Sequence, residues 1–497
     1  MKKKPIPLVA VFATALTLAA CSTPTTAPTD SPEPKDTFVV APQYATESLD
    51  PHGANSGGIG TTHPSMMIYS RLIAPDENGQ MRPDLAESWE PNESGTQYTF
   101  HLRQDAVFSD GTPVTSAEVV ASLERLVELQ GPASGNFAGT TIEAPDQYTV
   151  ILKKDGLILL GQVALLFVTK ADVTEESFTK PVGSGPFVVK ELLPSESLTL
   201  VPNETYYGAV PKIGEVNFRW IPEISTRLTA LQTGEIDATW GIPDDQVAAL
   251  TGNDELRVEQ VDTTLVVTMW FNHKRPAFQD AAVRNAIWQA IDFDSIIATL
   301  FPESGTPSLS NISPNVFGYS ANQAKKYDPA AARAALEASG FDFGQTLQIQ
   351  YKEPEYTQFL AAMASDLAEI GVTLEPVQKE AATWLEDFNG FNWDINFQQI
   401  GTAAYDAAQN TGRLYPCAAD RNGYCNPDLD ALLADAAGTA DQSRRAELYA
   451  EAGAIVWDEA IGMFPMLVRT TYAWNANAKG FVPDPLLQPN LAPVSFG

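Results

Sequence analysis

The 497-residue chain has little positive charge: 31 Lys and Arg stand against 62 Asp and Glu, which gives a formal net charge of −31. A nucleic-acid surface needs clustered Lys and Arg, and the sequence has no basic stripe. The charge balance therefore excludes nucleic acid as a partner and suits binding outside a cell. Hydrophobic residues still make up 44% of the chain, so it is globular, with room for about three domains.

Histidine and cysteine are also scarce, with four and three residues respectively. The histidines are scattered, so we predict no metal site and no cofactor; His52 as a metal ligand is the weaker alternative. The Gly-x-Ser-x-Gly and His-Glu-x-x-His motifs of hydrolases are missing. We therefore predict that the protein is not an enzyme. A pair of catalytic carboxylates among the many Asp and Glu is the one catalytic alternative left open.

Long hydrophobic runs are missing as well. Residues 8–20 are apolar but shorter than the roughly 18 residues of a membrane helix, and they follow lysines at 2–4, which is typical of a signal peptide over residues 1–20. The run ends Leu-Ala-Ala-Cys at Cys21, which resembles the bacterial lipobox, whose Cys carries the lipid. A plain secretory signal is the alternative. We predict a protein anchored at the outer face of the cytoplasmic membrane or located in the periplasm.

Residues 21–36 are rich in Ser, Thr and Pro and predict an extended tether. Cys417 and Cys425 are the two remaining cysteines. In an exported protein a disulfide between them is the default, and a metal-binding pair is the alternative.

Strands and helices alternate along the chain, which predicts an α/β fold. Thr37–Ala41 is β-branched and aromatic and predicts a strand, and residues 66–72 predict a short apolar helix. Other helices are predicted from residue 115 to 126, behind a capping box of Thr115 and Glu118, and as one long helix over Val283, Ile287 and Ile291. Helix starts are also predicted at Asp328-Pro329 and Asn426-Pro427.

Six short blocks occur in an order that is informative as a set. They are Pro83-Asp84-Leu85-Ala86-Glu87-Ser88-Trp89, residues 100–111, Gly183-Ser184-Gly185-Pro186-Phe187, residues 231–237, residues 283–292, and residues 424–430. Together they resemble family 5 of the bacterial solute-binding proteins, the peptide- and nickel-binding receptors of ABC importers. Most of these block residues are expected to have structural roles, such as fixing turns, and not to contact a ligand.

The resemblance implies an α/β, two-lobed, periplasmic-binding-protein-like fold of type II with an extra subdomain. Lobe I would comprise residues 37–73, 186–269 and 473–497, the subdomain residues 74–185, and lobe II residues 270–472. Two strands, near Val267–Asn272 and Leu467–Trp474, would cross between the lobes.

The resemblance also implies a function. The protein would be a monomeric, lipid-anchored receptor that captures peptides, or a similar small polar solute, between its lobes and delivers them to an ABC permease and its ATPase. An oligosaccharide or a nickel chelate is the alternative ligand. A signalling or chaperone protein of the cell envelope is the alternative from another class.

Peptide-binding members of the family carry a Trp and, three residues later, an Asp that pairs with the ligand's ammonium group. Here the corresponding positions are Gln399 and Thr402, so the amine-pairing carboxylate is missing. Asp406 is a possible substitute, with a solvated loop residue as the alternative. This departure puts peptides with a free amine in doubt.

Further candidate ligand contacts come from a glycine-rich loop and from aromatic residues. Asn55 and Ser56 lie in the loop 50–60, whose backbone amides can meet a carboxylate. The candidate cleft aromatics are Trp270, Trp384, Trp393 and Tyr405, with burial in the core as the alternative.

Overall fold

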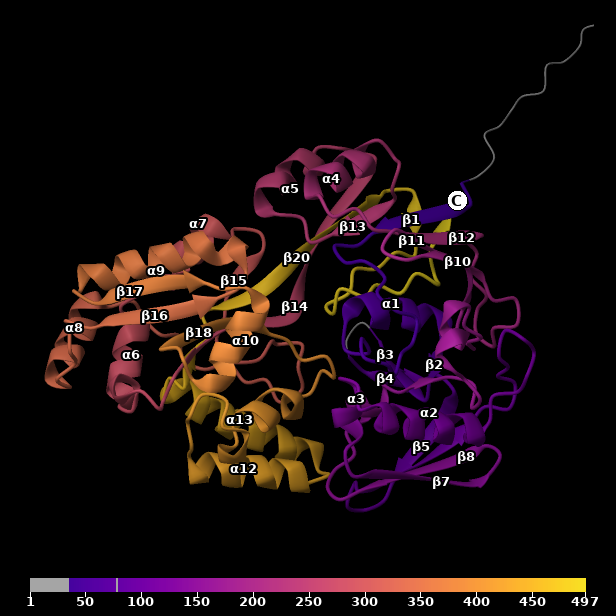
Figure 1. Ribbon diagram of the computed structural model, residues 1–497, viewed down its shortest axis with the longest axis horizontal. Helices are drawn as coiled ribbons and strands as arrows, with labels where there is room; N and C mark the ends of the chain where they lie inside the picture. The colour runs from indigo at the N-terminus through magenta and orange to yellow at the C-terminus, as the bar shows by residue number, and fades with distance from the viewer. Residues whose placement is uncertain (1–34, 77–78) are drawn as a thin grey trace, which may run out of the picture. The chain divides into compact units, whose positions relative to one another are not determined.

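The computed structural model describes residues 35–76 and 79–497 (Figure 1). The predicted signal peptide, the lipidation site Cys21 and nearly all of the tether lie outside the described residues. No helix in the described part of the chain is both long and apolar enough to cross a bilayer.

One sheet, made of twelve of the described strands, runs through both lobes. Its main order is β10-β11-β12-β1-β13-β20-β14-β18-β16-β17. The strands on the lobe I side are β1 (Thr37–Ala41), β10 (Phe187–Leu193), β11 (Ser197–Pro202), β12 (Glu215–Arg219) and β13 (Ala238–Trp240). Those on the lobe II side are β15 (Gly305–Pro307), β16 (Thr346–Tyr351), β17 (Thr373–Gln378), β18 (Ile395–Ile400) and β19 (Gly462–Met463).

Two long central strands, β14 (Leu256–Phe271) and β20 (Met466–Asn475), belong to both lobes. The first half of β14 pairs with β20, and its second half pairs with β18. The register of the β14–β20 pair shifts between Asp262 and Val266, where the strands pass from one lobe to the other. Of the two stretches predicted to cross between the lobes, Leu467–Trp474 lies within β20, and Val267–Asn272 covers the end of β14 and the residue after it.

Lobe II has one large hydrophobic core, which contains residues from Val266 to Leu467. Its helices are α6 (Ala281–Gln289), α7 (Phe293–Leu300), α8 (Pro329–Ala338), α9 (Thr357–Glu369), α10 (Ala381–Gly390), α11 (Thr411–Leu414), α12 (Pro427–Gly438) and α13 (Gln442–Asp458). The single long helix predicted over 283–291 is in fact two helices. Asp280 caps α6, which ends at Gln289, and Asp292 then caps α7 through the Ser295 N–H. Asp292 is thus a second start signal within the predicted helix, because an Asp at the N-cap accepts from the first free N–H groups of a helix.

Lobe I has smaller cores that join segments far apart in the chain. Phe38 and Val40 of β1 pack with residues near the C-terminus, such as Phe481 and Leu491. The lobe I helices are α1 (Ile59–Ile68), α4 (Ile224–Gln232) and α5 (Asp244–Thr251). The short helix predicted over 66–72 is wrong in its limits, because α1 ends at Ile68 and Ser70–Arg71 forms strand β2. β2 pairs with β9 (Phe167–Val168), and this pairing holds the backbone extended.

The subdomain is built on a four-stranded sheet, β5-β6-β8-β7, covered by α2. Its elements are β5 (Ala86–Pro91), β6 (Gln97–Leu102), β7 (Thr140–Asp146), β8 (Thr149–Lys154), α2 (Ser116–Leu129) and α3 (Leu160–Val163). The predicted capping box is present, with Thr115 and Glu118 bonded reciprocally. A hairpin of β3 (Ile73–Pro75) and β4 (Met81–Pro83) leads from lobe I into this part. The exact domain boundaries stay predictions.

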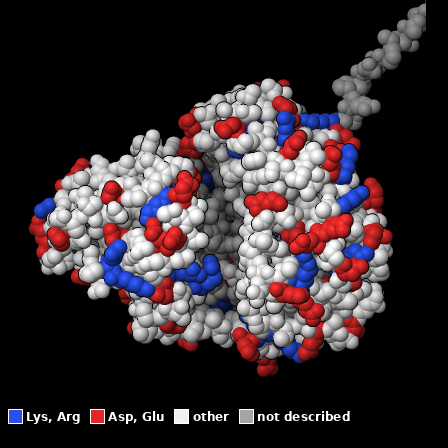
Figure 2. Space-filling view, viewed as in Figure 1, with Lys and Arg blue, Asp and Glu red and all other residues white. Residues whose placement is uncertain are grey.

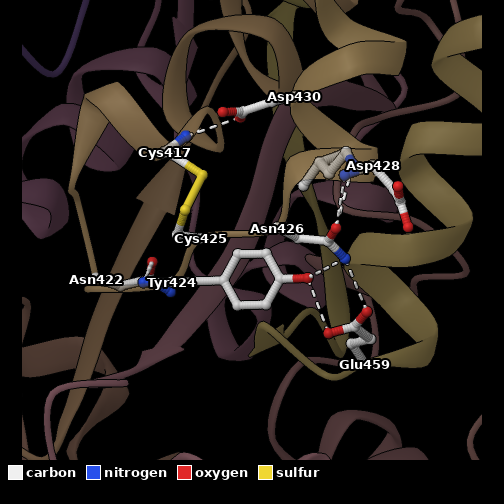
Figure 3. The surroundings of a disulfide bond; sticks show 9 residues. Cys417, Asn422, Tyr424, Cys425, Asn426, Asp428, Asp430 and Glu459 are labelled. Atoms are coloured by element: carbon white, nitrogen blue, oxygen red, sulfur yellow. Dashed lines mark hydrogen bonds between the residues drawn. A yellow bond between two sulfur atoms is a disulfide. The ribbon is translucent and has the colours of Figure 1, made fainter.

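The disulfide between Cys417 and Cys425 is present, as predicted, just before α12 (Figure 3). Asn426 caps α12 through the N–H groups of Asp428 and Leu429, and its amide donates to Glu459 at 3.0 Å. The Cys417 N–H donates to Asp430 at 2.8 Å. The bridge therefore closes a loop that also has its own hydrogen bonds to the helices behind it.

Replacing both cysteines by serine is expected to lower the free energy of unfolding by about 2.5 kcal/mol, because the unfolded chain regains the entropy of a short closed loop. Urea unfolding of the double variant against the wild type measures this. The wild type unfolded with a reducing agent should give the same loss. A loss below about 0.5 kcal/mol would mean that the surrounding hydrogen bonds alone hold the loop.

Candidate functional site

A cavity of about 830 Å³ lies between lobe II on one side and lobe I with the subdomain on the other. Figure 2 shows the surface hollowed between these two sides. Pockets for small ligands typically measure about 300 to 1,000 Å³, so the cavity can hold a ligand of a few residues. The largest part of its wall comes from α1, the β3–β4 hairpin and the C-terminal segment 480–493.

Lobe II contributes one loop, residues 401–405, and Thr264 and Leu265 of the crossing strand β14 line the cavity beside it. Thr402 is 1% exposed, and its N–H donates to Thr264 Oγ1 at 3.2 Å. The hydroxyl of Thr402 is buried and has no hydrogen-bond partner among the described residues. A buried hydroxyl normally has a partner, so this atom is available to a ligand in the cavity.

The two sides of the cavity meet at glycines of the lobe I side. A Cβ at Gly161 in α3 would overlap the carbonyl oxygen of Ala404 in lobe II. A Cβ at Gly79, at the tip of the β3–β4 hairpin, would lie 3.0 Å from the Tyr405 ring. At Gly161 the two sides therefore approach each other backbone to backbone, whereas the hairpin tip at Gly79 packs against the side chain of Tyr405.

Arg71 on β2 brings a positive charge to the cavity wall. Its backbone N–H donates to Asp84 Oδ2 at 2.8 Å, which fixes the residue at the start of the hairpin. Its guanidinium makes a single long hydrogen bond, from Nη1 to the Ala164 carbonyl at 3.4 Å. Arg71 forms no ion pair within the described residues. Most of its five N–H donors are therefore unused.

Two carboxylates accompany Arg71 on the wall, and their hydrogen bonding differs. Both oxygens of Asp84 are occupied, one by the Tyr207 hydroxyl and the other by the Arg71 N–H. Asp484 lies in the C-terminal segment, where Oδ1 accepts from the N–H groups of Leu486 and Gln488 at 2.9 and 3.0 Å. No hydrogen bond to Asp484 Oδ2 occurs in the described chain. Asp84 is thus a structural group, whereas Asp484 keeps one oxygen for another partner.

Burial dominates the electrostatics of these groups. It raises the pKa of Asp84, although the Tyr207 hydrogen bond and the Arg71 charge act against it. It raises the pKa of Asp484 in the same way, against two backbone N–H bonds and the charge of Arg71. It lowers the pKa of Arg71, which the carboxylates partly offset. Charges poorly solvated in this way gain most from an opposite charge on a ligand.

Of the residues singled out from the sequence, Ser56, Thr402 and Tyr405 line the cavity. Ser56 is 4% exposed, and its Oγ lies 3.4 Å from the Ala133 N–H. Asn55 is exposed and is not among the described residues of the wall. Gln399 lies within β18, paired with Val267 of β14, and also stays off the wall. Because β18 continues to Ile400, Gln399 is part of the paired strand and not of the loop that lines the cavity.

The three candidate tryptophans are brought together, but in the core of lobe II and not in the cleft. Trp270, Trp384 and Trp393 all stack on Phe388, with ring centroids 6.0, 5.4 and 5.8 Å from its ring. Each is less than a tenth exposed. The placement in the cleft is therefore corrected: large apolar rings gain more from mutual packing than from a wet wall.

Asp406 is corrected in a similar way. Its carboxylate takes both terminal nitrogens of Arg445 on α13, at 2.7 and 2.5 Å, and Arg445 is 2% exposed. Oδ1 also accepts from the Ala408 N–H. Asp406 is neither a solvated loop residue nor a free partner for a ligand ammonium group.

Arg71 and Asp484 were missed from the sequence. Arg71 fell inside the stretch predicted as a helix, and Asp484 stands between two prolines in a segment without periodicity. The one available signal was an arginine in an otherwise apolar run of a chain poor in cations. No group of three or more His, Cys, Asp or Glu suited to a metal ion occurs within residues 35–76 and 79–497.

Comparison with known proteins agrees with this architecture. The family model described as bacterial extracellular solute-binding proteins, family 5 Middle, matches residues 80–422. The chain is 28% identical over 485 residues to the probable D,D-dipeptide-binding periplasmic protein DdpA of Escherichia coli (strain K12), covering 92% of this chain and 93% of that protein. It is 24% identical over 509 residues to the dipeptide-binding protein of the same organism, covering 93% and 94%.

A solved structure has the same fold. The ABC transporter substrate-binding protein CtaP from Listeria monocytogenes superposes with a TM-score of 0.85 at 22% identity, covering 93% of this chain and all of that one. The family match spans more than half of the chain, and the cavity lies between two lobes joined by crossing strands. The chain therefore belongs to the bacterial extracellular solute-binding proteins of family 5, the substrate-binding components of ABC importers, and is not an enzyme.

Proposed function

We propose that the protein is a lipid-anchored receptor that captures a peptide, or a similar small polar solute, and delivers it to an ABC permease. The observation that carries this is the cavity itself, which is bounded by both lobes and contains unused polar groups. The anchor is the predicted lipid on Cys21. We further propose that Ser56, Thr402 and Tyr405 contact the ligand, and that the protein acts as a monomer.

Peptides are favoured among the possible solutes by two lines of support. The relatives named above are described as binding a D,D-dipeptide and dipeptides. The cavity wall also combines apolar surface with charges of both signs, Arg71 and Asp484, which suits a compound with charged ends and an apolar middle. A purely apolar ligand would leave these charges buried without partners.

Binding would work through closure of the lobes. A ligand that touches the loop 401–405 on one side and the lobe I wall on the other stabilises the closed state by its extra contacts. β14 and β20 connect the lobes, and the register shift between Asp262 and Val266 interrupts the ladder where a bend costs least. We propose the predicted lobe limits, residues 37–73, 186–269 and 473–497 against 270–472, as the bodies that move.

The proposal predicts that the purified mature protein carries a small polar ligand, detected by native mass spectrometry and sequenced after release. In Gly161→Ala the ligand is expected to be largely lost, because the new methyl group overlaps the Ala404 carbonyl and holds the lobes apart. Gly135→Ala is the matched control: it lies in the same subdomain, and its new methyl group meets nothing within 4 Å.

Short peptides released from the wild type and Gly135→Ala, but not from Gly161→Ala, support a peptide receptor. A sugar or a metal chelate with the same pattern would contradict the peptide assignment and keep the receptor. A ligand retained equally by Gly161→Ala would show that binding does not depend on closure and would contradict the mechanism.

A further inference from the structure

Resting on the receptor function proposed above, we propose that Arg71 and Asp484 form a subsite for a short zwitterion. Arg71 would bind the carboxylate of the ligand, and Asp484 would bind its ammonium group. The ligand class is a dipeptide, or a compound of similar size, with both ends unblocked. This assigns the amine-binding role, which Thr402 cannot perform, to a carboxylate on the opposite wall of the cavity.

The guanidinium of Arg71 is held at the cavity wall, and most of its N–H donors have no partner within the described residues. The backbone N–H of Arg71 is fixed by Asp84, and the Phe167 ring lies 5.6 Å from the guanidinium carbon. The side chain is thereby held in place. Its guanidinium nitrogens make only one long hydrogen bond within the described residues, so its other N–H donors are free to bind a ligand. A planar guanidinium with free donors matches a carboxylate, which it can bind through two parallel N–H bonds.

Asp484 is fixed in the complementary way. Two backbone N–H groups hold Oδ1, and the Asp484 carbonyl accepts from the Tyr472 hydroxyl at 2.8 Å, so the residue is clamped to β20. Oδ2 remains for a ligand. Asp484 shares the cavity lining with Tyr405 of the lobe II loop, and burial, together with the charge of Asp484, raises the pKa of Tyr405.

The other charged groups of the wall are already engaged. Asp84 uses both oxygens within the protein, and Asp76 is paired with Arg82 at 2.7 Å. Arg71 and Asp484 are thus the cation and the carboxylate of the wall that still have unused hydrogen-bonding groups. They influence each other's pKa, yet no ion pair joins them in the described chain. A zwitterion placed between them satisfies both charges, whereas a singly charged ligand leaves one of them without a partner.

The hydroxyl of Thr402 is an independent sign that the same cavity is built for a polar ligand. Thr402 is 1% exposed and lines the cavity from lobe II, and its hydroxyl has no partner among the described residues. A peptide held at both ends by lobe I would present its amide to this hydroxyl. The charged ends of the ligand would then be bound by lobe I, and lobe II would contact its amide through Thr402 when the lobes close.

The test is calorimetric titration of the full mature protein with the stereoisomers of Ala-Ala, their N-acetyl forms and their C-terminal amides. We expect an unblocked isomer to bind, and each block to weaken binding at least 100-fold. Asp484→Asn keeps the Oδ1 acceptor for the backbone. This variant should lower the affinity for the unblocked peptide at least 30-fold and leave the affinity for the N-acetyl form unchanged.

Arg71→Gln should show the converse pattern, with a loss for the unblocked and acetylated forms and none for the amide. Arg219→Gln, on β12 of lobe I, 42% exposed and away from the cavity wall, is the matched control and should bind as the wild type. Unfolding curves check that each variant is folded. Equal losses for all three ligand forms would reduce Arg71 and Asp484 to structural roles and overturn the proposal.

Binding of none of the unblocked isomers would also overturn the zwitterion subsite. That result leaves the receptor function standing if a closure-sensitive ligand still co-purifies, since Gly161→Ala tests the receptor separately. Unchanged affinity in both variants, with an unblocked isomer bound, would place the charged ends of the ligand elsewhere in the cavity.

Discussion

Asp406→Ala is expected to lower the free energy of unfolding by about 3 to 5 kcal/mol. The substitution leaves the guanidinium of Arg445 charged, 2% exposed and without its carboxylate. The two rings over Arg445, Phe317 at 4.9 Å and Tyr449 at 5.1 Å, cannot replace the lost hydrogen bonds. Urea unfolding followed by tryptophan fluorescence measures the loss.

Two further variants separate the buried charge from other causes. In Asp406→Ala with Arg445→Met the charge is removed together with its partner, so most of the stability should return. The adjacent pair Arg444–Glu447 is the matched surface control: Arg444 is 48% exposed, and Glu447→Ala should cost less than about 1 kcal/mol. An Asp406→Ala variant within 1 kcal/mol of the wild type would mean that water reaches Arg445.

Acid is expected to destabilise the protein steeply, starting well above the range of ordinary carboxylates. Burial lowers the pKa of His52 and His63 to about 4 and that of His273 to about 3. Between these values and the unfolded pKa of 6.5, the unfolded chain binds protons that the folded chain does not. Stability is therefore complete above about pH 6.5 and falls by about 1.4 kcal/mol per pH unit for each histidine as the pH drops.

The carboxylates Asp84 and Asp484 act in the opposite direction, because their pKa is raised in the folded chain and protonation at low pH favours folding. Measuring the free energy of unfolding against pH in single histidine variants separates the contribution of the histidines from that of the carboxylates. His63→Gln should reduce the slope between pH 6.5 and 4 by one proton, whatever it does to stability at neutral pH. An unchanged slope in His63→Gln would contradict the prediction.

Much of the fold was predictable because its local signals agree with the tertiary structure. The strand at Thr37–Ala41, the Thr115 capping box and the Cys417–Cys425 bridge all rest on short-range chemistry. The two wrong predictions, the helix over 66–72 and the single helix over 283–291, both relied on apolar content. Residues after Ile68 look helical by apolar content but pair with β9, about 100 residues away, and the cap at Asp292 was outweighed by a continuing apolar period.

The candidate site was predictable only in part. The family resemblance pointed to the stretch that contains Gln399 and Thr402, and of these two Thr402 does line the cavity. The tryptophans were indistinguishable from core residues, since composition does not say which face a ring occupies. Asp484 belongs to a segment that returns to the cavity wall from the end of the chain. Its position follows from the packing of Leu491 and Val494 beside Phe38, which no local pattern encodes.

The topology of the central sheet has a consequence for biogenesis. Strand β1 leads the folded chain, yet its neighbour β13 pairs on its other side with β20, which ends at Asn475. A chain that emerges N-terminus first can assemble the core of lobe II once residue 467 is available, but the sheet of lobe I must wait for the residues that follow. The lobe that is synthesised first is thus completed last. Until then its strand edges stay open, which leaves the lobe I segments exposed to pairing with other chains while lobe II is already able to fold.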